Sequence, residues 1–508
     1  MLPAKVHRTI YIVLLVALGA SMVTSVFLAN MAWVFLCVNW LLEGRWREKW
    51  QMAKESRLLH AFVGLYLLML VGMLWTSDTG AGWGTLQVLL PLLCVPIVIL
   101  TTKPVKGNAR KAVLMCYSIA VFVVSIIGLV RWLTIPGLPH RDIVPYISHI
   151  RFALNCCVVV YLCVGVMLNG TRTQRWIVMP LMAWMLAFMV IIHSYTGIAV
   201  LAVVSLVMLL TRWHRWPLIT LWVLLVGGTI GVVYYEAKNY YNMVPLAEAP
   251  LAGFTANGRP YEHARDGIIE NGNYIDNYVC DEELRTEWNR RSTLDYDGLA
   301  RGGYSIKSTL IRYLNGLGMT KDSVGVAALS PVQIIAIENG IANPVYEDGN
   351  VLRKMVYTML LEREFYVHTH AVAGFTMLQR LEMWRAATYV ISEHPWFGVG
   401  TGDVVGAMDE YLTASDSELA GHRMNCHSQY LGIMAALGIV GFGVVVLLFL
   451  RTIIPLRRFR HAMSGTLMLP WLLTVLISMV TEDTLATLAG ILFCTYFLAF
   501  RNGKSIVS

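Results

Sequence analysis

Long apolar stretches alternate with shorter polar segments along most of this chain. Most of them approach or reach the roughly 17 to 25 residues that a helix needs to cross a hydrocarbon core. Inside a membrane each segment must satisfy its own backbone hydrogen bonds, so the pattern predicts an all-α polytopic membrane protein. We expect about twelve transmembrane helices, near residues 9–24, 26–42, 58–75, 84–101, 112–132, 151–168, 176–193, 196–211, 216–236, 428–450, 466–480 and 484–500.

One long polar region interrupts the apolar stretches and divides the chain into three parts. We predict an N-terminal transmembrane bundle of about nine helices over 1–236, a large loop over 237–426, and about three C-terminal transmembrane helices over 427–508. Apolar residues spaced among charges in DEELRTEWNRRS and VLRKMVYTMLLEREF indicate amphipathic helices, so the loop is expected to be a mainly helical subdomain. Ser330 before Pro331 is a helix-start signal within it.

Composition supports a membrane protein. Hydrophobic residues make up 56% of the chain and charged residues only 14%, whereas soluble domains carry about one-quarter charged residues. The net charge of +8 is explained by basic loops next to membrane lipids, because about half of the Lys and Arg lie there. We therefore expect contact with membrane lipids and no nucleic-acid partner.

The basic residues also predict the orientation in the membrane. Short cytoplasmic loops carry an excess of Lys and Arg, and here every second loop is basic while the alternate loops are not. This alternation predicts cytoplasmic termini and a periplasmic location for the loop 237–426. The first apolar block is too long for a cleavable signal peptide and is expected to remain as an anchor. The basic loops contain Arg45, Arg47, Lys49, Lys54 and Arg57, then Lys103, Lys106, Arg110 and Lys111, then Arg172 and Arg175, Arg212 and Arg215, and Arg457, Arg458 and Arg460.

Seven of the nine cysteines lie in apolar stretches, where a free thiol behaves as a small hydrophobic side chain. The other two, Cys280 and Cys426, are predicted to face the oxidising periplasm. Their wide separation gives no spacing signature, so whether they form a disulfide stays open.

Ionisable residues at the membrane edges gather on the predicted outer side. A single outward-facing pocket could collect most of them, and intramembrane or edge charges usually mark function. Arg binds phosphate oxygens with a planar, permanently charged fork, so a lipid diphosphate is a suitable ligand. A His beside it could accept the proton of an acceptor hydroxyl. The residues are Arg131, His149, Arg151, His193, Tyr195, Arg380, Arg385, His427, Glu482 and Asp483.

The most distinctive motif runs over 379–431. It contains an Arg, a Trp four residues later, a P-x-x-G-x-G-x-G turn over 395–402, and the sequence HSQYL at the start of an apolar stretch. This combination resembles the O-antigen ligase and polymerase family, most specifically over 379–441. The resemblance implies a fold similar to the GT-C class and a metal-independent, inverting transfer of a glycan from undecaprenyl diphosphate, with no cofactor.

The resemblance also implies roles for individual residues. Arg380 would contact the donor diphosphate, and His427 would lie near the acceptor hydroxyl. Ser428 stands where the family more often has Asn. Tyr195 stands where members often carry a second donor-binding Arg, and Arg151 is the best candidate to supply the missing charge.

Several other residues are possible supporting members of the site. His193, Arg385 and Glu482 lie at the same predicted edge, although an interfacial or solvated role explains each of them simply. Gly400 and Gly402 lie in a Gly-rich run that follows no strand, which excludes a dinucleotide site. A tight turn with backbone N–H groups near an anion is the better interpretation of these glycines.

Three functions remain in view. The first is a ligase that joins the glycan to lipid A core. The second is a polymerase or protein O-oligosaccharyltransferase with the same donor and a different acceptor. The third, a polysaccharide transporter, should show inverted repeats and charges at mid-membrane, and the sequence shows neither. A non-catalytic scaffold stays open as well, because Tyr195 breaks the usual pair of Arg residues.

Overall fold

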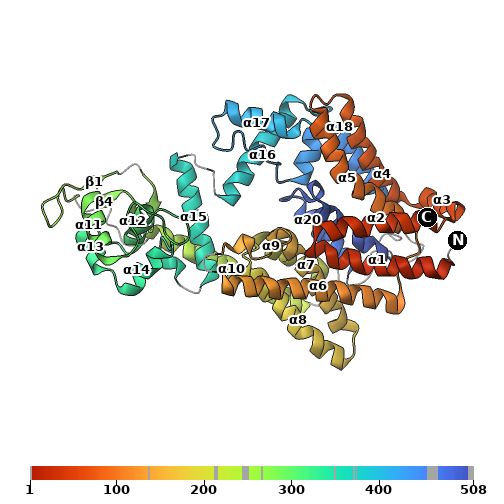
Figure 1. Ribbon diagram of the computed structural model, residues 1–508, viewed down its shortest axis with the longest axis horizontal. Coiled ribbons are helices and arrows are strands. Elements are labelled where there is room, and N and C mark those ends of the chain that lie inside the picture. The colour runs from red at the N-terminus through yellow and green to blue at the C-terminus, as the bar shows by residue number, and fades with distance from the viewer. Residues whose placement is uncertain are drawn as a thin grey trace. The chain divides into compact units, whose positions relative to one another are not determined.

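The computed structural model describes residues 3–135, 138–210, 216–242, 251–264, 267–347, 350–369, 372, 375–454 and 467–501 (Figure 1). The chain forms two compact units. The first comprises Met1–His214 and Arg380–Ser508, and the second comprises Arg215–Gln379. The three-part division at residues 236 and 426 stays a prediction.

The first unit is built from helices. Many begin with a side-chain cap, such as Ser56, Asp78 and Thr171, which accept hydrogen bonds from orphan N–H groups of the first turn. The helices are α1 Ala4–Thr24, α2 Val26–Leu42, α3 Trp46–Glu55, α4 Arg57–Val71, α5 Thr79–Leu100, α6 Gly107–Thr134, α7 His149–Asn169, α8 Arg172–Ile191, α9 Tyr195–Leu210, most of α16 Thr376–Glu393, α17 Val404–Ala414, α18 Gln429–Ile453, α20 Met468–Ser478 and α21 Leu488–Tyr496, with the 3-10 turns η1 Gly72–Leu74, η2 His140–Asp142, η4 Thr484–Ala486 and η5 Phe497–Phe500.

Seven helices in the described part of the chain are long and apolar enough to cross a membrane, namely α1, α4 with η1, α5, α6, α7, α8 and α18. The bent pair α2 and α3 passes the same test as one unit, and α9, α20 and α21 with η5 are shorter apolar helices. The stretch 216–236 lies in α10 Trp216–Asn242, so each of the twelve predicted stretches overlaps a helix. The protein is a mainly helical membrane protein, while the number of twelve spans stays a prediction.

Helix packing in the first unit buries one large apolar core. Helix α1 packs on α2 and α6, α18 packs on α4, α21 packs on α5, and α7 packs on α8 and α9. Tyr117 of α6 is fully buried and contacts the rings of Tyr496 and Phe497. Its hydroxyl donates to Asn155 Oδ1 of α7 at 2.6 Å, so this buried polar pair is satisfied.

Helix α18 is broken at Gly438, although its sequence reads as one continuous apolar span. Gly438 has φ 66° and ψ −175°, which only glycine adopts readily. The segment 395–400 fills the break, because Val399 N donates to Ala435 O at 3.0 Å and Ile439 N donates to Pro395 O at 2.8 Å. The Gly-rich run therefore replaces the missing hydrogen bonds of the helix.

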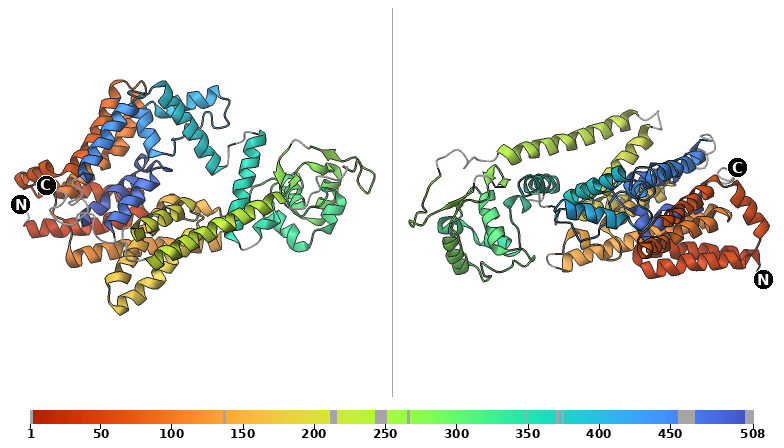
Figure 2. Two further views of the ribbon diagram at one scale, coloured as in Figure 1. Left: turned by 180° about the vertical axis from the view of Figure 1, so that it is seen from behind. Right: turned by 90° about the horizontal axis from the view of Figure 1, so that it is seen from above.

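The second unit is a small helical domain with two short sheets. Its buried centre includes Trp288 and Tyr313, and the predicted start of α14 at Ser330 is confirmed by a capping box with Gln333. Figure 2 shows α10 as one long helix. The elements are α10 Trp216–Asn242, α11 Asp281–Arg291, α12 Ile306–Gly316, α13 Ser323–Ala328, α14 Pro331–Glu338, η3 Pro344–Tyr346 and α15 Val351–Thr369, with antiparallel pairs of β1 Glu262–His263 with β4 Asn277–Val279 and of β2 Ile269–Glu270 with β3 Asn273–Tyr274.

Both cysteines whose pairing was left open are free thiols, and both are buried. Cys280 lies before α11 in the second unit, and Cys426 lies before α18 in the first. Part of the predicted basic pattern, at Arg212, Arg215, Arg457, Arg458 and Arg460, lies outside the described residues.

Candidate active site

His427 lies two residues before α18, and a carboxylate holds its backbone. Its N–H donates to Asp483 Oδ2 at 2.7 Å, although 56 residues separate the two in sequence. His427 has φ 54°, a left-handed conformation that a residue other than glycine adopts only when its surroundings enforce it. The second oxygen of Asp483 faces the thiol of Cys426 at 3.5 Å. Asp483 therefore fixes the main chain that carries the imidazole.

Arg380, in the second turn of α16, is bonded to the residue before Asp483. Its Nη2 lies 2.5 Å from Glu482 Oε1, and the two side chains are 13% and 10% exposed. One turn further along the same helix, Trp384 Nε1 donates to the carbonyl of His427 at 3.3 Å. The motif residues Arg380, Trp384 and His427 are thus parts of one hydrogen-bonded cluster.

Arg151 joins this cluster from the first turn of α7. Its Nη2 donates to the carbonyl of Asp483 at 3.4 Å. The three residues that the sequence predicted to share a site, Arg151, Arg380 and His427, therefore all contact the two-residue segment Glu482–Asp483. The cluster is therefore built from four segments that lie far apart in the chain.

Several polar atoms in the cluster are buried without a hydrogen-bond partner. They include the Nε atoms of Arg151 and Arg380 and the hydroxyls of Thr481 and Thr484. Buried polar groups in proteins are almost always bonded, so unpaired guanidinium donors indicate a place for an acceptor. Sequence reasoning missed Thr481 and Thr484; their signal is the short polar run TEDT between two apolar stretches.

Burial and charge shift the protonation equilibria here. Burial lowers the pKa of His427, Arg380 and Arg151 lower it further, and Asp483 opposes them. Burial raises the pKa of Glu482 against the effect of Arg380 and Arg151, and it also raises that of Asp483 against the effect of His427. At neutral pH the imidazole is therefore neutral and able to accept a proton.

Residues 326–446 match the family model described as O-antigen ligase. This stretch contains the 379–441 motif with Arg380 and His427. No curated protein matches the chain. The match confirms the resemblance seen in the sequence and supports a membrane glycosyltransferase-like enzyme. Arg151 and Glu482 lie outside the matched stretch and belong to the same cluster as Arg380 and His427 through the contacts described above.

Among the residues that the structure describes, the remaining predicted ones do not take part in the hydrogen bonds of this cluster. The ring of His193 stacks on that of His140 with centroids 3.6 Å apart, and Tyr195 lies 6.2 Å from His193. These three form an aromatic group at the α8–α9 turn. Arg385 is 64% exposed and lies 4.0 Å from Glu382 of its own helix, so it faces away from the buried cluster.

Gly400 and Gly402 act in packing, with their N–H groups bonded inside the protein. Gly400 N donates to Ala436 O at 3.0 Å, and Gly402 N donates to Thr76 Oγ1 at 3.3 Å. An added Cβ at Gly402 would lie 2.2 Å from the carbonyl of Asp78. These glycines thus make close backbone contacts, and their expected role beside an anion stays a prediction.

In the described part of the chain, no three His, Cys, Asp or Glu residues are grouped to hold a metal ion. The positive charge available to an anion at this site comes from Arg151 and Arg380.

Proposed function

We propose that this protein is an O-antigen ligase that transfers a glycan from undecaprenyl diphosphate to lipid A core on the periplasmic face of the bacterial cytoplasmic membrane. One observation carries the proposal: within a cluster that includes the family motif, two guanidinium groups keep buried, unpaired Nε donors beside a neutral His. This combination suits a reaction whose leaving group is a diphosphate and whose nucleophile is a hydroxyl.

Arg151 and Arg380 bind the donor diphosphate in this proposal. Their unpaired Nε–H groups are directed donors, and the guanidinium charge is permanent. Negative charge grows on the diphosphate as its bond to the sugar breaks, so the two Arg side chains stabilise the transition state more than the ground state. Arg151 then supplies the charge that Tyr195 lacks at the position where family members often carry Arg.

His427 is the proposed base. It accepts the proton of the acceptor hydroxyl while that oxygen forms a bond to the anomeric carbon of the donor sugar. The bond from the same carbon to the diphosphate breaks, and undecaprenyl diphosphate leaves with the electron pair. Attack from the opposite face inverts the anomeric centre. The lowered pKa of His427 keeps the imidazole unprotonated for this step.

Glu482 and Asp483 are proposed as positioning residues. Glu482 holds the Arg380 guanidinium at 2.5 Å, and Asp483 holds the His427 backbone at 2.7 Å. Adjacent residues therefore orient the donor-binding group and the base relative to each other. Because both carboxyl groups already have a raised pKa, the negative charge of an arriving diphosphate would favour their protonated forms.

The test is glycan display in a deletion strain carrying wild type, Arg151→Ala, Arg380→Ala or His427→Ala at matched protein levels. A ligase that uses these residues gives loss of capped lipid A core and accumulation of long lipid-linked polymer in all three variants. Single-repeat products would identify a polymerase, and a loss of glycosylated protein would identify a protein O-oligosaccharyltransferase.

Two matched controls separate chemistry from folding. Arg141→Ala removes an Arg whose side chain is 71% exposed on η2, and His422→Ala removes an exposed His five residues before His427. Both controls should display glycan as wild type does. Normal display in the three site variants would overturn the catalytic assignment.

A further inference from the structure

Helix α3 has the features of a helix that lies along a membrane surface. The chain bends by 117° between α2 and α3 at Gly44 and Arg45, both of which have positive φ. Trp46 and Trp50 are one helical turn apart and are 54% and 64% exposed. Trp side chains favour the membrane interface, and amphipathic helices rich in Lys and Trp lie in its plane.

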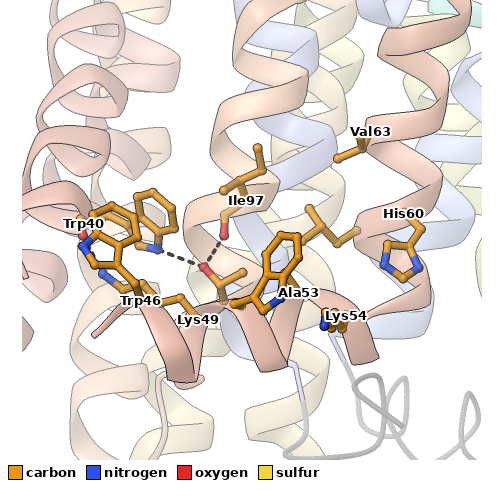
Figure 3. Close-up of a pocket in the computed structure, with 11 residues that line it drawn as sticks. Trp40, Trp46, Lys49, Ala53, Lys54, His60, Val63 and Ile97 are labelled. Carbon is orange, nitrogen blue, oxygen red and sulfur yellow. Dashed lines mark hydrogen bonds between the residues drawn. The ribbon is translucent and has the colours of Figure 1, made fainter. Parts of the chain in front are cut away.

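An apolar cavity of about 620 Å³ opens between α3, α4 and α5. This volume lies within the range of about 300–1,000 Å³ that is typical of ligand pockets. Figure 3 shows Trp46, Lys49, Ala53 and Lys54 along α3, with His60 and Val63 from α4 and Ile97 from α5. Trp40 and Trp50 complete an aromatic wall that suits a hydrocarbon chain.

A second cavity of about 1050 Å³ shares Lys49 and Thr101 with the first and has a different character. Six basic and three acidic residues line it. The acidic residue Glu43 pairs with Arg45 and Lys49, at 3.7 Å and 3.2 Å. The basic residues are Arg8, Arg45, Lys49, Lys103, Lys106 and Arg501.

Two lysines supply exposed positive charge to the second cavity. Lys103 and Lys106 are exposed, and within the described residues no ion pair involves either of them. By contrast, Arg501 is buried and donates to the carbonyls of Ile99, Leu100 and Thr102 at 2.9–3.0 Å. A ligand phosphate would therefore meet Lys103 and Lys106 first.

We propose that the two cavities form one binding site for an anionic glycerophospholipid. The phosphate lies between Lys103 and Lys106, and an acyl chain lies against Trp40, Trp46 and Trp50. An apolar space and a basic one that share Lys49 and Thr101 match the two ends of such a lipid. Under the predicted topology this end faces the cytoplasm, where the leaflet carries anionic lipid.

The position of the site argues against the glycan donor as its occupant. Lys106 immediately precedes α6. Arg131, in the last turn of that helix, donates to the backbone carbonyl of Asp142, in the connection that leads to α7 and Arg151. A helix of 28 residues is about 40 Å long. The phospholipid site and the proposed donor site therefore lie at opposite ends of α6.

The test is lipid titration of the purified full-length protein in detergent, followed by native mass spectrometry. The probes are phosphatidylglycerol, phosphatidylcholine and undecaprenyl phosphate. We expect phosphatidylglycerol to bind more tightly than phosphatidylcholine by about tenfold or more, because each Lys near a phosphate adds attraction. Equal binding of the two phospholipids, or preference for undecaprenyl phosphate, would overturn the proposal.

Two variants address the two ends of the lipid. Lys103→Gln with Lys106→Gln removes the headgroup charges, and Ala53→Trp fills the apolar cavity. Each should weaken phosphatidylglycerol binding about tenfold. The matched control, Lys5→Gln with Lys111→Gln, removes the same charge from exposed lysines that line neither cavity. Equal losses in the control and the headgroup variant would show attraction by net charge alone and sink the assigned site.

Discussion

Arg380 and Glu482 form an ion pair at 2.5 Å across 102 residues of sequence, with both side chains largely buried. The pair joins α16, which carries the most recognisable motif of the chain, to the turn between α20 and α21. The adjacent residue Asp483 holds His427. One short acidic turn thus positions both an Arg suited to diphosphate and a His suited to a hydroxyl.

A double-mutant cycle on this ion pair should reveal strong coupling. Arg380→Ala should lower kcat/KM for glycan transfer about 10²- to 10³-fold, because it removes a donor to the developing negative charge. Glu482→Ala should lower kcat/KM by a smaller factor, since the Arg380 guanidinium remains. The double variant should lose little more than Arg380→Ala alone, because Glu482 acts through Arg380. Additive losses, measured as initial rates with purified enzyme in lipid nanodiscs, would contradict a shared role.

The pair should also contribute to folding. Removal of one partner of a buried ion pair leaves an uncompensated charge and costs about 3–5 kcal/mol. Arg380→Ala should therefore lower the midpoint of thermal unfolding, whereas the double variant should recover part of the loss. Thermal unfolding followed by circular dichroism at 222 nm measures the midpoints of both variants. Arg141→Ala, at an exposed position, should leave the midpoint unchanged.

The pH dependence of kcat/KM should follow His427. A general base works only when unprotonated, and burial with Arg380 and Arg151 lowers the pKa of this imidazole below its ordinary 6.5. The rate should therefore stay high at pH 7 and fall only as the pH drops below 6.5. Asp483→Asn removes a charge that raises the pKa and should move this fall to lower pH. Arg380→Gln removes a charge that lowers it and should move the fall to higher pH.

Glu410→Gln is the matched control for the pH profiles, because it removes a carboxylate from an exposed position on α17. Its profile should overlay that of wild type. If the acid limb of kcat/KM stays at the same pH in Asp483→Asn and Arg380→Gln, then His427 is not the group that titrates. Assays with the donor saturating and the acceptor varied keep donor binding from masking the shift.

The helices could be predicted from the sequence, because hydropathy and capping depend only on residues that are neighbours in the chain. Each predicted apolar stretch overlaps a helix, and the start of α14 follows from Ser330 and Pro331 alone. The 117° bend before α3 was not predicted, because Arg45 and the residues after it read as a basic loop. Nor was the break in α18, since residues of another segment supply the hydrogen bonds that replace it.

The candidate site was predictable to a similar extent. Arg380 and His427 follow from the family motif, and Arg151 follows from its place at a predicted membrane edge. Which groups touch depends on tertiary contacts that no local pattern encodes, such as the bond from His427 N to Asp483. The amides of Gly400 and Gly402 illustrate the same limit, because only the structure shows that Ala436 and Thr76 already accept their hydrogen bonds.

Glycan transfer should require the guanidinium group of Arg151, as expected of a side chain that binds phosphate. Arg151→Ala should lower kcat/KM about 10²-fold, and Arg151→Lys should recover only part of this, because an ammonium group lacks the fork geometry. Tyr195→Arg in the Arg151→Ala background should restore activity partly if the position of Tyr195 also reaches the donor. Full activity of Arg151→Ala would remove this residue from the site. The measurement is the rate of undecaprenyl diphosphate release by wild type, Arg151→Ala, Arg151→Lys and the double variant.

Gly438 should be the least replaceable glycine of α18. An added Cβ would lie 2.3 Å from the backbone of Trp396, and φ 66° with ψ −175° is strained for any L side chain. Gly438→Ala should therefore lower the free energy of unfolding by at least about 1–3 kcal/mol, the usual cost of such a conformation. Because the segment 395–400 bonds to this break, the change should also displace α16, which ends just before it, and weaken glycan transfer.

Gly443→Ala is the matched control, five residues further along the same helix. No atom lies within 4 Å of an added Cβ there, and Ala favours a helix over Gly by about 1 kcal/mol. Gly443→Ala should therefore unfold at the same temperature as wild type or slightly higher, with unchanged activity. If Gly438→Ala behaved in the same way, the break in α18 would not be maintained by the absence of a side chain. The backbone hydrogen bonds from residues 395–400 would then have to hold it open alone, and Pro395, whose carbonyl accepts from Ile439, would become the position to change.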